Sequence, residues 1–271
     1  MIAGQPATLS MSAEVLRQRR RSSLLRVLFV VAEVVVALSL WEVAVGVFVV
    51  VNPIFFPPPS AVLAGFLTLV GSGVLVEHAA YSFQNFAIGY VLGASAGISC
   101  GLLLGSSFVL GKLLAPIAWT LYAFPQIAIR PMTTIWFGFG APPIIFLVFL
   151  ASFFPVLLNT MSGVRTVDPM LLRAGRVFGA RRRELWWKIL LPATVPFVLT
   201  GLRLAVVSGF IGLLVSELVG SPRGFGALIS ISSSRYLVNE AFAVIIVLVT
   251  STTVLVRLVG NLETRLSVWR T

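Results

Sequence analysis

Six long apolar stretches constrain the fold of this chain more than any other feature of its sequence. An α-helix needs about 20 apolar residues to cross the hydrocarbon core of a bilayer, and each stretch is close to that length. They cover Val27–Val51, Ser82–Leu104, Leu113–Ile129, Ile144–Gly163, Thr194–Leu218 and Val238–Val259. None shows the period-two alternation of a membrane-spanning barrel. We therefore predict an all-α polytopic membrane protein with six transmembrane helices, in which residues 27–271 form one domain after a polar tail over residues 1–26.

The basic residues indicate how these helices are oriented. Five Lys or Arg lie in the tail, seven lie between the fourth and fifth stretches, Lys112 follows the second stretch and three close the chain. With six spans, these sixteen fall on one side of the membrane, and only Arg130, Arg223 and Arg235 fall on the other. By the positive-inside rule we expect both termini to be cytoplasmic. The net charge of +11 then reflects topology rather than binding to nucleic acid.

The polar segment Val164–Pro192, called the coupling loop below, has the pattern of a folded helix pair. Asp168 suits the N-cap of a helix and Pro169 suits its first position. Gly179 stands where a helix ends in the left-handed conformation. Apolar residues recur at helical spacing on one face, at Met170, Leu171, Ala174, Val177 and Phe178. The pattern predicts a short surface helix, a glycine hinge and a second helix that returns to the membrane at Pro192.

The second helix of the coupling loop is expected to begin at Arg181. Glu184 and Lys188 follow at a spacing of four residues, which allows an ion pair on one helix face. So much patterned polar sequence on the basic side of the membrane favours a docking partner. The alternative is an amphipathic helix that rests on lipid headgroups.

Small residues mark one face of the second apolar stretch. Glycine recurs at every fourth position, at Gly89, Gly93, Gly97, Gly101 and Gly105. Such a ridge lets a second helix approach backbone to backbone. We expect it to pack inside one chain; the alternative is a path for a ligand along the ridge.

Glu42 and Glu217 are carboxylates within apolar stretches, and they need an explanation because ionisable groups at membrane depth face protein or water. Glu42 is expected to be a hydrogen-bonded structural carboxylate, with a role in moving a solute as the alternative. Glu217 ends the fifth stretch shortly before Arg223, and an ion pair between them would fix the loop that contains Arg223. The alternative makes Glu217 part of a gate or a docking point.

The segment Tyr122–Gly140, which begins in the third apolar stretch, contains two prolines that interrupt it. Pro125 and Pro131 lie six residues apart, and both cannot lie within regular helix. Broken helices at membrane depth line cavities more often than they face lipid. We therefore predict that polar residues at the break and at the ends of nearby spans line a passage, namely Gln126, Thr133, Thr134, Trp136, Asn159 and Glu217.

The sequence lacks the residues that catalysis or cofactor binding would need. No glycine-rich run ends in Gly-Lys-Ser or Gly-Lys-Thr, so no phosphate-binding loop is predicted. His78 and Cys100 are the only histidine and cysteine, which leaves no Ser/His/Asp set, disulfide or cysteine metal site. We expect no enzyme activity, no metal and no cofactor on this chain, so energy for active transport must come from a partner.

The coupling loop resembles the EAA loop of ABC importer permeases. That pattern reads Glu-Ala-Ala, three residues, Gly, and about nine residues later Ile-x-Leu-Pro. Here Arg173-Ala174-Gly175 is followed by Gly179 and then by Ile189, Leu191 and Pro192, so Arg173 replaces the family's Glu and Gly175 its second Ala. The resemblance implies ATPase-coupling roles for Asp168, Pro169, Arg173, Ala174, Gly175, Arg176, Phe178, Gly179 and Arg181.

Five further motifs stand in the order found in permeases of the nitrate, sulfonate and taurine importer group. They are Phe56–Ser60, Ile135–Gly140, Phe154-Pro155 with Asn159, Ser216–Leu218 and Arg223–Gly226. The resemblance implies a multi-pass permease of the bacterial inner membrane that acts as a pair of copies. Its implied partners are membrane lipid, two cytoplasmic ABC ATPases, which hold ATP and Mg, and an extracytoplasmic solute-binding protein.

The same resemblance implies a sulfonate, taurine, nitrate or similar solute. A permease of this architecture for a small organic such as a thiamine-precursor pyrimidine is an alternative, and so is a passive channel.

Overall fold

The computed structural model describes residues 29, 31–48, 52 and 54–266. The basic tail over residues 1–26 and both ends of the first predicted span lie outside the described residues. All regular secondary structure within the described residues is helical, which confirms the all-α prediction. Contacts divide the chain into two compact units, Met1–Ala64 and Gly65–Thr271, and each is described by itself. The prediction of one domain over residues 27–271 stays a prediction.

The first unit holds a helix over residues 31–42 that continues into the π-helical turn η1, Val43–Val47. The Glu42 carboxylate accepts hydrogen bonds from the backbone N–H and the hydroxyl of Ser60, at 3.0 and 2.7 Å. The Trp41 and Phe56 rings lie beside it with centroids 5.2 Å apart. Glu42 therefore has the structural role expected of it, because its charge is satisfied by hydrogen bonds at the start of α2, Pro59–Gly71.

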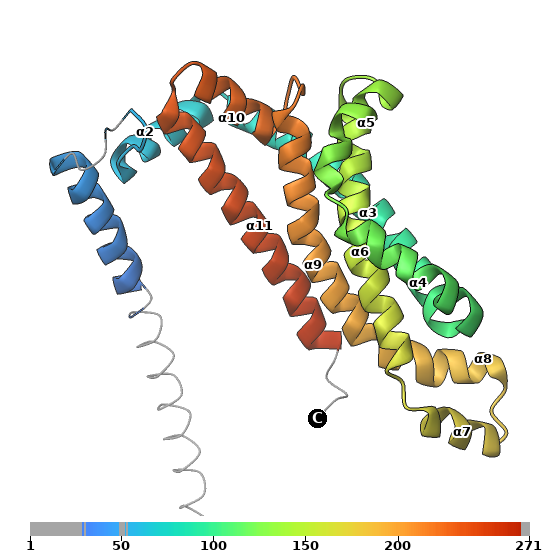
Figure 1. Ribbon diagram of the computed structural model, residues 1–271. Helices are drawn as coiled ribbons and strands as arrows, with labels where there is room; N and C mark the ends of the chain where they lie inside the picture. The colour runs from blue at the N-terminus through green and yellow to red at the C-terminus, as the bar shows by residue number, and fades with distance from the viewer. Residues whose placement is uncertain (1–28, 30, 49–51, 53, 267–271) are drawn as a thin grey trace, which may run out of the picture. The chain divides into compact units, whose positions relative to one another are not determined.

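Three long helices form the core of the second unit, α3 (Val74–Ser106), α6 (Ala141–Arg165) and α9 (Leu191–Leu218). The central helix is α6, which packs along both α3 and α9 (Figure 1). Its residues Ile144, Val148 and Val156 have no exposed surface. A helix apolar on all sides is buried by neighbours on more than one face, and α6 has the sequence of such a helix.

The glycine ridge of α3 is the surface that contacts α6. A Cβ built on Gly93 would lie 2.6 Å from the Phe149 carbonyl oxygen, and one on Gly97 would lie 2.8 Å from that of Phe153. Gly89 and Gly101 face α6 carbonyl oxygens in the same way, and Gly105 faces the Val164 side chain of α6. The two backbones approach too closely for any side chain, which confirms the predicted packing within one chain.

Four helices of the described part are long and apolar enough to cross a membrane. They are Val74–Ser106, Ala141–Arg165, Arg182–Leu218 and Val238–Asn261, and they coincide with the second, fourth, fifth and sixth predicted spans. The last lies within α11, Val238–Leu266. A bent pair of helices adds up to one more span. The count of six stays a prediction, because the first predicted span lies partly outside the described residues.

The predicted bounds of the third span, Leu113–Ile129, are wrong. Helix α4 covers Phe108–Ala123 and is followed by the 3₁₀ turn η2, Gln126–Ile129, and by α5, Arg130–Phe137, with a bend of 79°. The bend confirms the predicted break, since Phe124 before Pro125 is extended and Pro125 has no N–H to donate. Lys112 was placed in a loop, but Ser107 caps α4 and Lys112 lies within this helix.

The remaining helices lie at the two ends of this core. The segment after α6 forms α7 (Pro169–Val177) and α8 (Arg182–Leu185), and the π-helical turn η3 (Trp186–Leu190) then leads directly into α9. Helix α10, Phe225–Ser234, follows α9 and lies at its opposite end from α8 (Figure 1). The second unit therefore has one end built around α7 and α8 and another where α9 meets α10.

Candidate functional site

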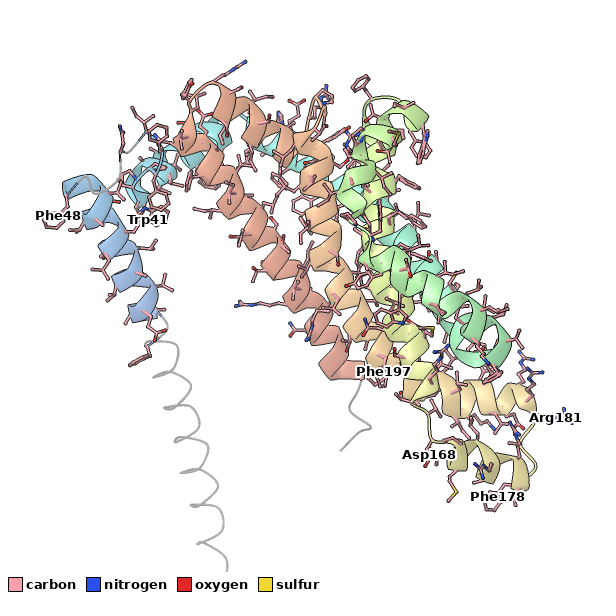
Figure 2. All side chains as sticks on the ribbon, in the orientation of Figure 1. Trp41, Phe48, Asp168, Phe178, Arg181 and Phe197 are labelled. Atoms are coloured by element: carbon pink, nitrogen blue, oxygen red, sulfur yellow. The ribbon has the colours of Figure 1, made fainter. Side chains whose placement is uncertain are left out.

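Helix α7 of the coupling loop is fixed at both ends by its own sequence. The Asp168 carboxylate accepts a hydrogen bond of 2.7 Å from the Met170 N–H, and Pro169 occupies the first position. After the helix, Gly179 has a φ of +80°, the left-handed conformation that ends helices. The cap, the proline and the glycine stop all lie where they were predicted. Figure 2 shows Asp168 and Arg181 at the two ends of the α7 hairpin.

The return helix of the coupling loop also follows the prediction. The Arg181 N–H donates to the Glu184 carboxylate at 2.9 Å, and the Lys188 ammonium lies 3.1 Å from the same group. This exposed ion pair adds little to stability, but the bond to Arg181 caps the start of α8. Pro192 is the second residue of α9 and directly follows the π-helical turn η3.

Gly175 is the position through which α7 packs onto the return helix. A Cβ built on Gly175 would lie 2.6 Å from Leu185 Cδ2 and 3.2 Å from Ile189 Cδ1. The close approach explains why glycine is suited to the place where the EAA pattern has its second Ala. Most of the remaining α7 surface is left open, including Arg173, Ala174 and Arg176.

The exposed surface of α7 is largely apolar. Four large side chains form what we call the α7 apolar face: Met170, Leu171, Val177 and Phe178. Val177 is 85% exposed and Phe178 is 89% exposed, at the tip of the hairpin (Figure 2). Contiguous exposed apolar side chains of this kind mark binding surfaces. The alternative prediction of a helix that rests on lipid headgroups is considered with the proposed function.

At the other end of α9 the polar groups are buried and hydrogen-bonded. Glu217 has no exposed surface. Its carboxylate lies 2.8 Å from the Ser82 hydroxyl and accepts a hydrogen bond of 3.0 Å from the Gly226 N–H. The Ser82 oxygen in turn accepts from the Phe225 N–H at 2.8 Å. A carboxylate therefore satisfies the first backbone donors of α10, as expected at the positive end of a helix dipole.

The predicted ion pair between Glu217 and Arg223 is wrong. The Arg223 side chain lies 3.3 Å from Glu77, at the first turn of α3, and both groups are exposed. Glu217 points inward instead, because Gly224 has a φ of +109° and leaves room for the carboxylate. A Cβ built on Gly224 would lie 2.2 Å from Glu217 Cδ. The Arg-Gly-Phe-Gly motif thus folds its backbone, not its arginine, around Glu217.

Arg130 is the residue of this end that sequence reasoning missed. It was counted as a loop charge, yet it is only 2% exposed. Its guanidinium donates to the carbonyl oxygens of Ser216 at 2.9 Å and Val219 at 2.8 Å, and also to the Thr134 hydroxyl. A cation at the last carbonyls of α9 complements the helix dipole. The signal in the sequence was an arginine within an otherwise apolar stretch.

Comparison with known proteins assigns the chain to a family. Residues 89–268 match the family described as the binding-protein-dependent transport system inner membrane component. The chain belongs to this family. A Bacillus subtilis (strain 168) protein assigned to aliphatic sulfonate transport permeases, SsuC, is 34% identical over 235 residues, 87% of this chain and 85% of the relative.

Two further relatives agree with that assignment. The taurine transport system permease protein TauC of Escherichia coli (strain K12) is 31% identical over 86% of both chains. The nitrate import permease protein NrtB of Leptolyngbya laminosa is 33% identical over 59% of this permease and 58% of its own length. The predicted resemblance to the nitrate, sulfonate and taurine group is confirmed, and this chain is an ABC transporter permease.

Solved structures share the fold of this permease. An amino acid ABC transporter gives a TM-score of 0.56 at 16% identity, covering 73% of this chain and 95% of the other. An inward-facing MetNI methionine ABC transporter gives 0.54 at 17% identity, covering 69% and 92%. The apolar helices of the described part and the family's description as an inner membrane component make this permease a multi-pass membrane protein, and the family implies ATPase and binding-protein partners in general.

The six residues predicted to line a passage through the permease do not share one cavity. Gln126 lines a cavity of about 260 Å³ between the α4–η2 break and helices α6 and α9, with Tyr122, Phe124, Ile127, Leu147, Ala151, Ser208, Ile211 and Gly212. The Thr133 hydroxyl donates to the Arg130 carbonyl and is buried. Trp136 is 61% exposed, and the Asn159 amide donates to the Pro155 carbonyl within α6. Their role in transport stays a prediction, as does that of Glu217.

Proposed function

We propose that this chain is the permease subunit of an ATP-driven importer and that its coupling loop docks onto a cytoplasmic ABC ATPase. The observation that carries the proposal is the α7 apolar face, at the position of the EAA loop. Phe178 at its tip is the kind of exposed aromatic residue that becomes the anchor of a protein interface. A helix resting on lipid would turn its apolar residues toward the spans, whereas Phe178 lies at the tip of the hairpin formed by α7 and α8, and Val177, its neighbour in sequence, is 85% exposed.

A continuous run of helix connects the proposed docking surface on α7 to the membrane-spanning part of α9. Gly175 holds α7 against Leu185, so a displacement of α7 moves α8. From Arg182 to Leu218 the chain is helical without a break, through η3 and α9. We infer that closure of the ATPase moves α9 as a lever and thereby changes the passage. The π-helical turn in η3 is a type of local distortion found frequently at functional sites.

The charge distribution supports a cytoplasmic position for α7. Five exposed arginines cluster on the coupling loop, at Arg173, Arg176, Arg181, Arg182 and Arg183. At the other end of α9, the exposed Arg223 is paired with Glu77. The positive-inside rule then places the coupling loop and both termini in the cytoplasm and the α9–α10 junction outside.

The remaining partners follow from the family and not from contacts within this chain. We propose a pair of permease copies, two ATPases that hold ATP and Mg, and an extracytoplasmic binding protein. In that arrangement the ATPase hydrolyses ATP and this chain is not an enzyme. Exposed apolar residues along α4 and α11 would face lipid or the second copy, for example Leu113, Ile117, Ile246 and Val249.

The solute we propose is a small sulfonate, taurine, nitrate or a similar oxyanion, because relatives with those names cover most or much of the chain. The cavity beside the α4–η2 break fits a role in the passage. Tyr122, Gln126 and Ser208 bring polar side chains to it, of which the Ser208 hydroxyl donates to the Leu204 carbonyl, and no charged residue lines it. Neutral donors hold an anion weakly enough for release, which conduction requires.

The experiment that tests this function is ATP hydrolysis by the permease reconstituted with its ATPase in liposomes. We expect vanadate-sensitive hydrolysis that depends on the permease and is lost in Gly179→Asp, which disturbs the left-handed stop after α7. Gly73→Asp is the matched control. Gly73 has a similar φ of +74° and open space around it, but it precedes α3 at the end away from α7.

Two results would contradict the proposal. Equal rates of ATP hydrolysis with and without the permease would rule out coupling between the permease and the ATPase. Solute flux that needs no ATP would assign the chain to the passive channels. Loss of hydrolysis in both glycine variants would show that the effect is not specific to the coupling loop. Flux of labelled taurine, a sulfonate and nitrate in the same liposomes, with the binding protein present, then distinguishes the solutes.

A further inference from the structure

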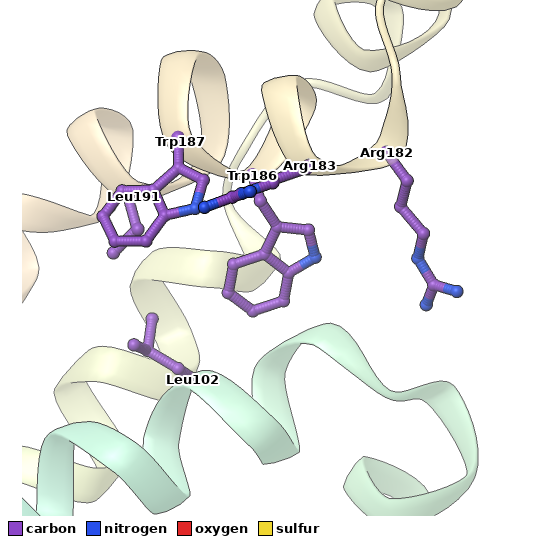
Figure 3. A pocket seen from close by; sticks show the side chains of 6 residues that line it. All are labelled: Leu102, Arg182, Arg183, Trp186, Trp187 and Leu191. Atoms are coloured by element: carbon purple, nitrogen blue, oxygen red, sulfur yellow. The ribbon is translucent and has the colours of Figure 1, made fainter.

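A groove of about 730 Å³ lies where α3 ends and the return helix of the coupling loop begins. It is lined by Leu102, Arg182, Arg183, Trp186, Trp187 and Leu191. Figure 3 shows the Trp186 ring and the Arg182 side chain on the same side of the α8–η3 segment, with Leu102 facing them from α3. The volume lies within the range of about 300–1,000 Å³ typical of ligand pockets.

The chemistry of this groove changes from one side to the other. Leucines and indole rings form its apolar part, and two exposed arginines, Arg182 and Arg183, also line it. In the part of the chain that the structure describes, no carboxylate lies within ion-pair distance of either arginine. Glu184 on the same helix is held by Lys188 and by the Arg181 N–H. The groove therefore offers two uncompensated cations next to an apolar floor.

The place of the groove in the fold says which kind of molecule reaches it. Leu102 lies about one turn before the end of α3, and Leu191 opens α9, so both belong to predicted or observed spans. Tryptophan and arginine are enriched at this level of membrane proteins, where rings meet acyl chains and cations meet headgroups. The groove thus adjoins the bilayer, and its charge is opposite to that of an anionic lipid.

We propose that this groove binds the headgroup and upper acyl chain of an anionic phospholipid. Arg182 and Arg183 pair with the phosphodiester, and guanidinium groups suit this because they form bidentate hydrogen bonds with phosphate oxygens. Trp186, Trp187, Leu102 and Leu191 contact the glycerol and the first acyl carbons. The proposal uses the membrane location of the family and does not depend on ATP coupling. A lipid held here would tether the return helix, and with it α7, to the membrane surface.

Native mass spectrometry of the full chain in detergent, titrated with dioleoylphosphatidylglycerol or dioleoylphosphatidylcholine, tests the proposal. We expect a saturable phosphatidylglycerol adduct that forms roughly tenfold more tightly than the phosphatidylcholine adduct, since each basic residue near an anionic surface adds several-fold to binding. The double variant Arg182→Gln/Arg183→Gln should lose this preference to within about twofold. Arg173→Gln/Arg176→Gln, which removes two exposed arginines from α7, should keep it.

Two further measurements separate lipid recognition from folding. Arg182→Lys/Arg183→Lys retains the charge and should retain most of the preference. In liposomes of the wild-type chain, brominated phosphatidylglycerol should quench tryptophan fluorescence more than brominated phosphatidylcholine does. Trp187→Phe should reduce that difference, because Trp187 lines the groove and is 65% exposed.

Several outcomes would overturn the lipid site. An equal preference for phosphatidylglycerol in the two glutamine variants would show that the groove does not recognise the headgroup. Displacement of the adduct by millimolar inorganic phosphate would assign the groove to a free anion. If Arg182→Gln/Arg183→Gln kept its lipid preference but no longer co-purified with the ATPase, the groove would belong to the protein interface.

Discussion

The two ends of α9 differ in which side chains they bury. Where α9 meets α10, Glu217 and Arg130 are buried, and every hydrogen bond that they make is to this chain. At the α7 end, Asp168 and Glu184 cap exposed helices, and the large apolar side chains Val177 and Phe178 face outward. The first end buries its charged groups among hydrogen-bonding groups of this chain, whereas the second leaves large apolar side chains exposed.

This difference predicts whether a substitution at either end changes the stability of the fold or the binding of a partner. At the α9–α10 junction a substitution should lower the stability of the fold, because buried partners lose their hydrogen bonds. On the α7 apolar face it should leave stability unchanged and weaken a complex. Four substitutions test whether the α9–α10 junction determines stability and the α7 apolar face determines binding.

Gly224→Ala should destabilise the permease by about 3–5 kcal/mol, since it adds a methyl group where the backbone is left-handed and Glu217 already fills the space. The ideal Cβ lies 2.2 Å from Glu217 Cδ and φ is +109°. The measurement is the thermal unfolding midpoint of the purified chain in detergent. Gly138→Ala is the control, with a φ of +77° and open space around it. Equal shifts in the two variants would show that contact with Glu217 does not matter.

Arg130→Met should cost about 2–4 kcal/mol, because the buried Ser216 carbonyl and the Val219 carbonyl both lose a charged donor. Methionine fills similar space without charge. The same unfolding assay checks the effect, and Arg223→Met is the control, because its ion pair with Glu77 is exposed. If Arg130→Met unfolded at the same temperature as the wild-type chain, the Arg130 cation would not stabilise this end. The contrast between the two ends of α9 would then be weaker.

Phe178→Ala should shift the unfolding midpoint very little, since the side chain is 89% exposed. It should weaken the complex with the ATPase by about 2 kcal/mol, or roughly thirtyfold, as truncation of an interface anchor does. Binding is measured by titration of the ATPase onto the permease in nanodiscs. Phe108→Ala, at an 82% exposed phenylalanine on α4, serves as the control. A similar loss for both phenylalanines would mean that α7 is not the docking element.

Asp168→Ala should cost about 1 kcal/mol locally, the usual value of a helix N-cap, and should fray the first turn of α7. Hydrogen exchange at the Met170 and Leu171 amides should speed up while that of α6 is unchanged. Asp168→Asn is the matched variant, because it can still accept from the Met170 N–H. If exchange at α7 did not change in Asp168→Ala, the cap would not be what holds this helix.

The local features of the fold were predictable from the sequence because each depends on residues near one another. Asp168, Pro169 and Gly179 bound α7 through its own backbone, and Pro125 breaks the third span by its missing N–H. The spacing of glycines on α3 also predicted a close helix contact, although not which helix would supply it.

The partners of the buried charges could not be predicted in this way. Arg223 lies six residues after Glu217, and that proximity suggested an ion pair, yet the carboxylate bonds to Ser82, 135 residues earlier in the chain. Arg130 likewise reaches carbonyls 86 and 89 residues away. Such choices depend on how α3, α5 and α9 pack, and periodicity within one helix carries no information on that.

The glycine ridge limits which motions the permease can make. Its five glycine notches repeat every four residues, and four of them face a backbone carbonyl of α6, whereas Gly105 faces the Val164 side chain. If α3 slid along α6, side chains would collide with the facing helix at the glycine positions. The collision would end only when the next glycine came into place, about 6 Å further on. The contacts along the ridge therefore fix the register of α3 on α6. Any rearrangement during a transport cycle has to move the two helices together as one rigid body.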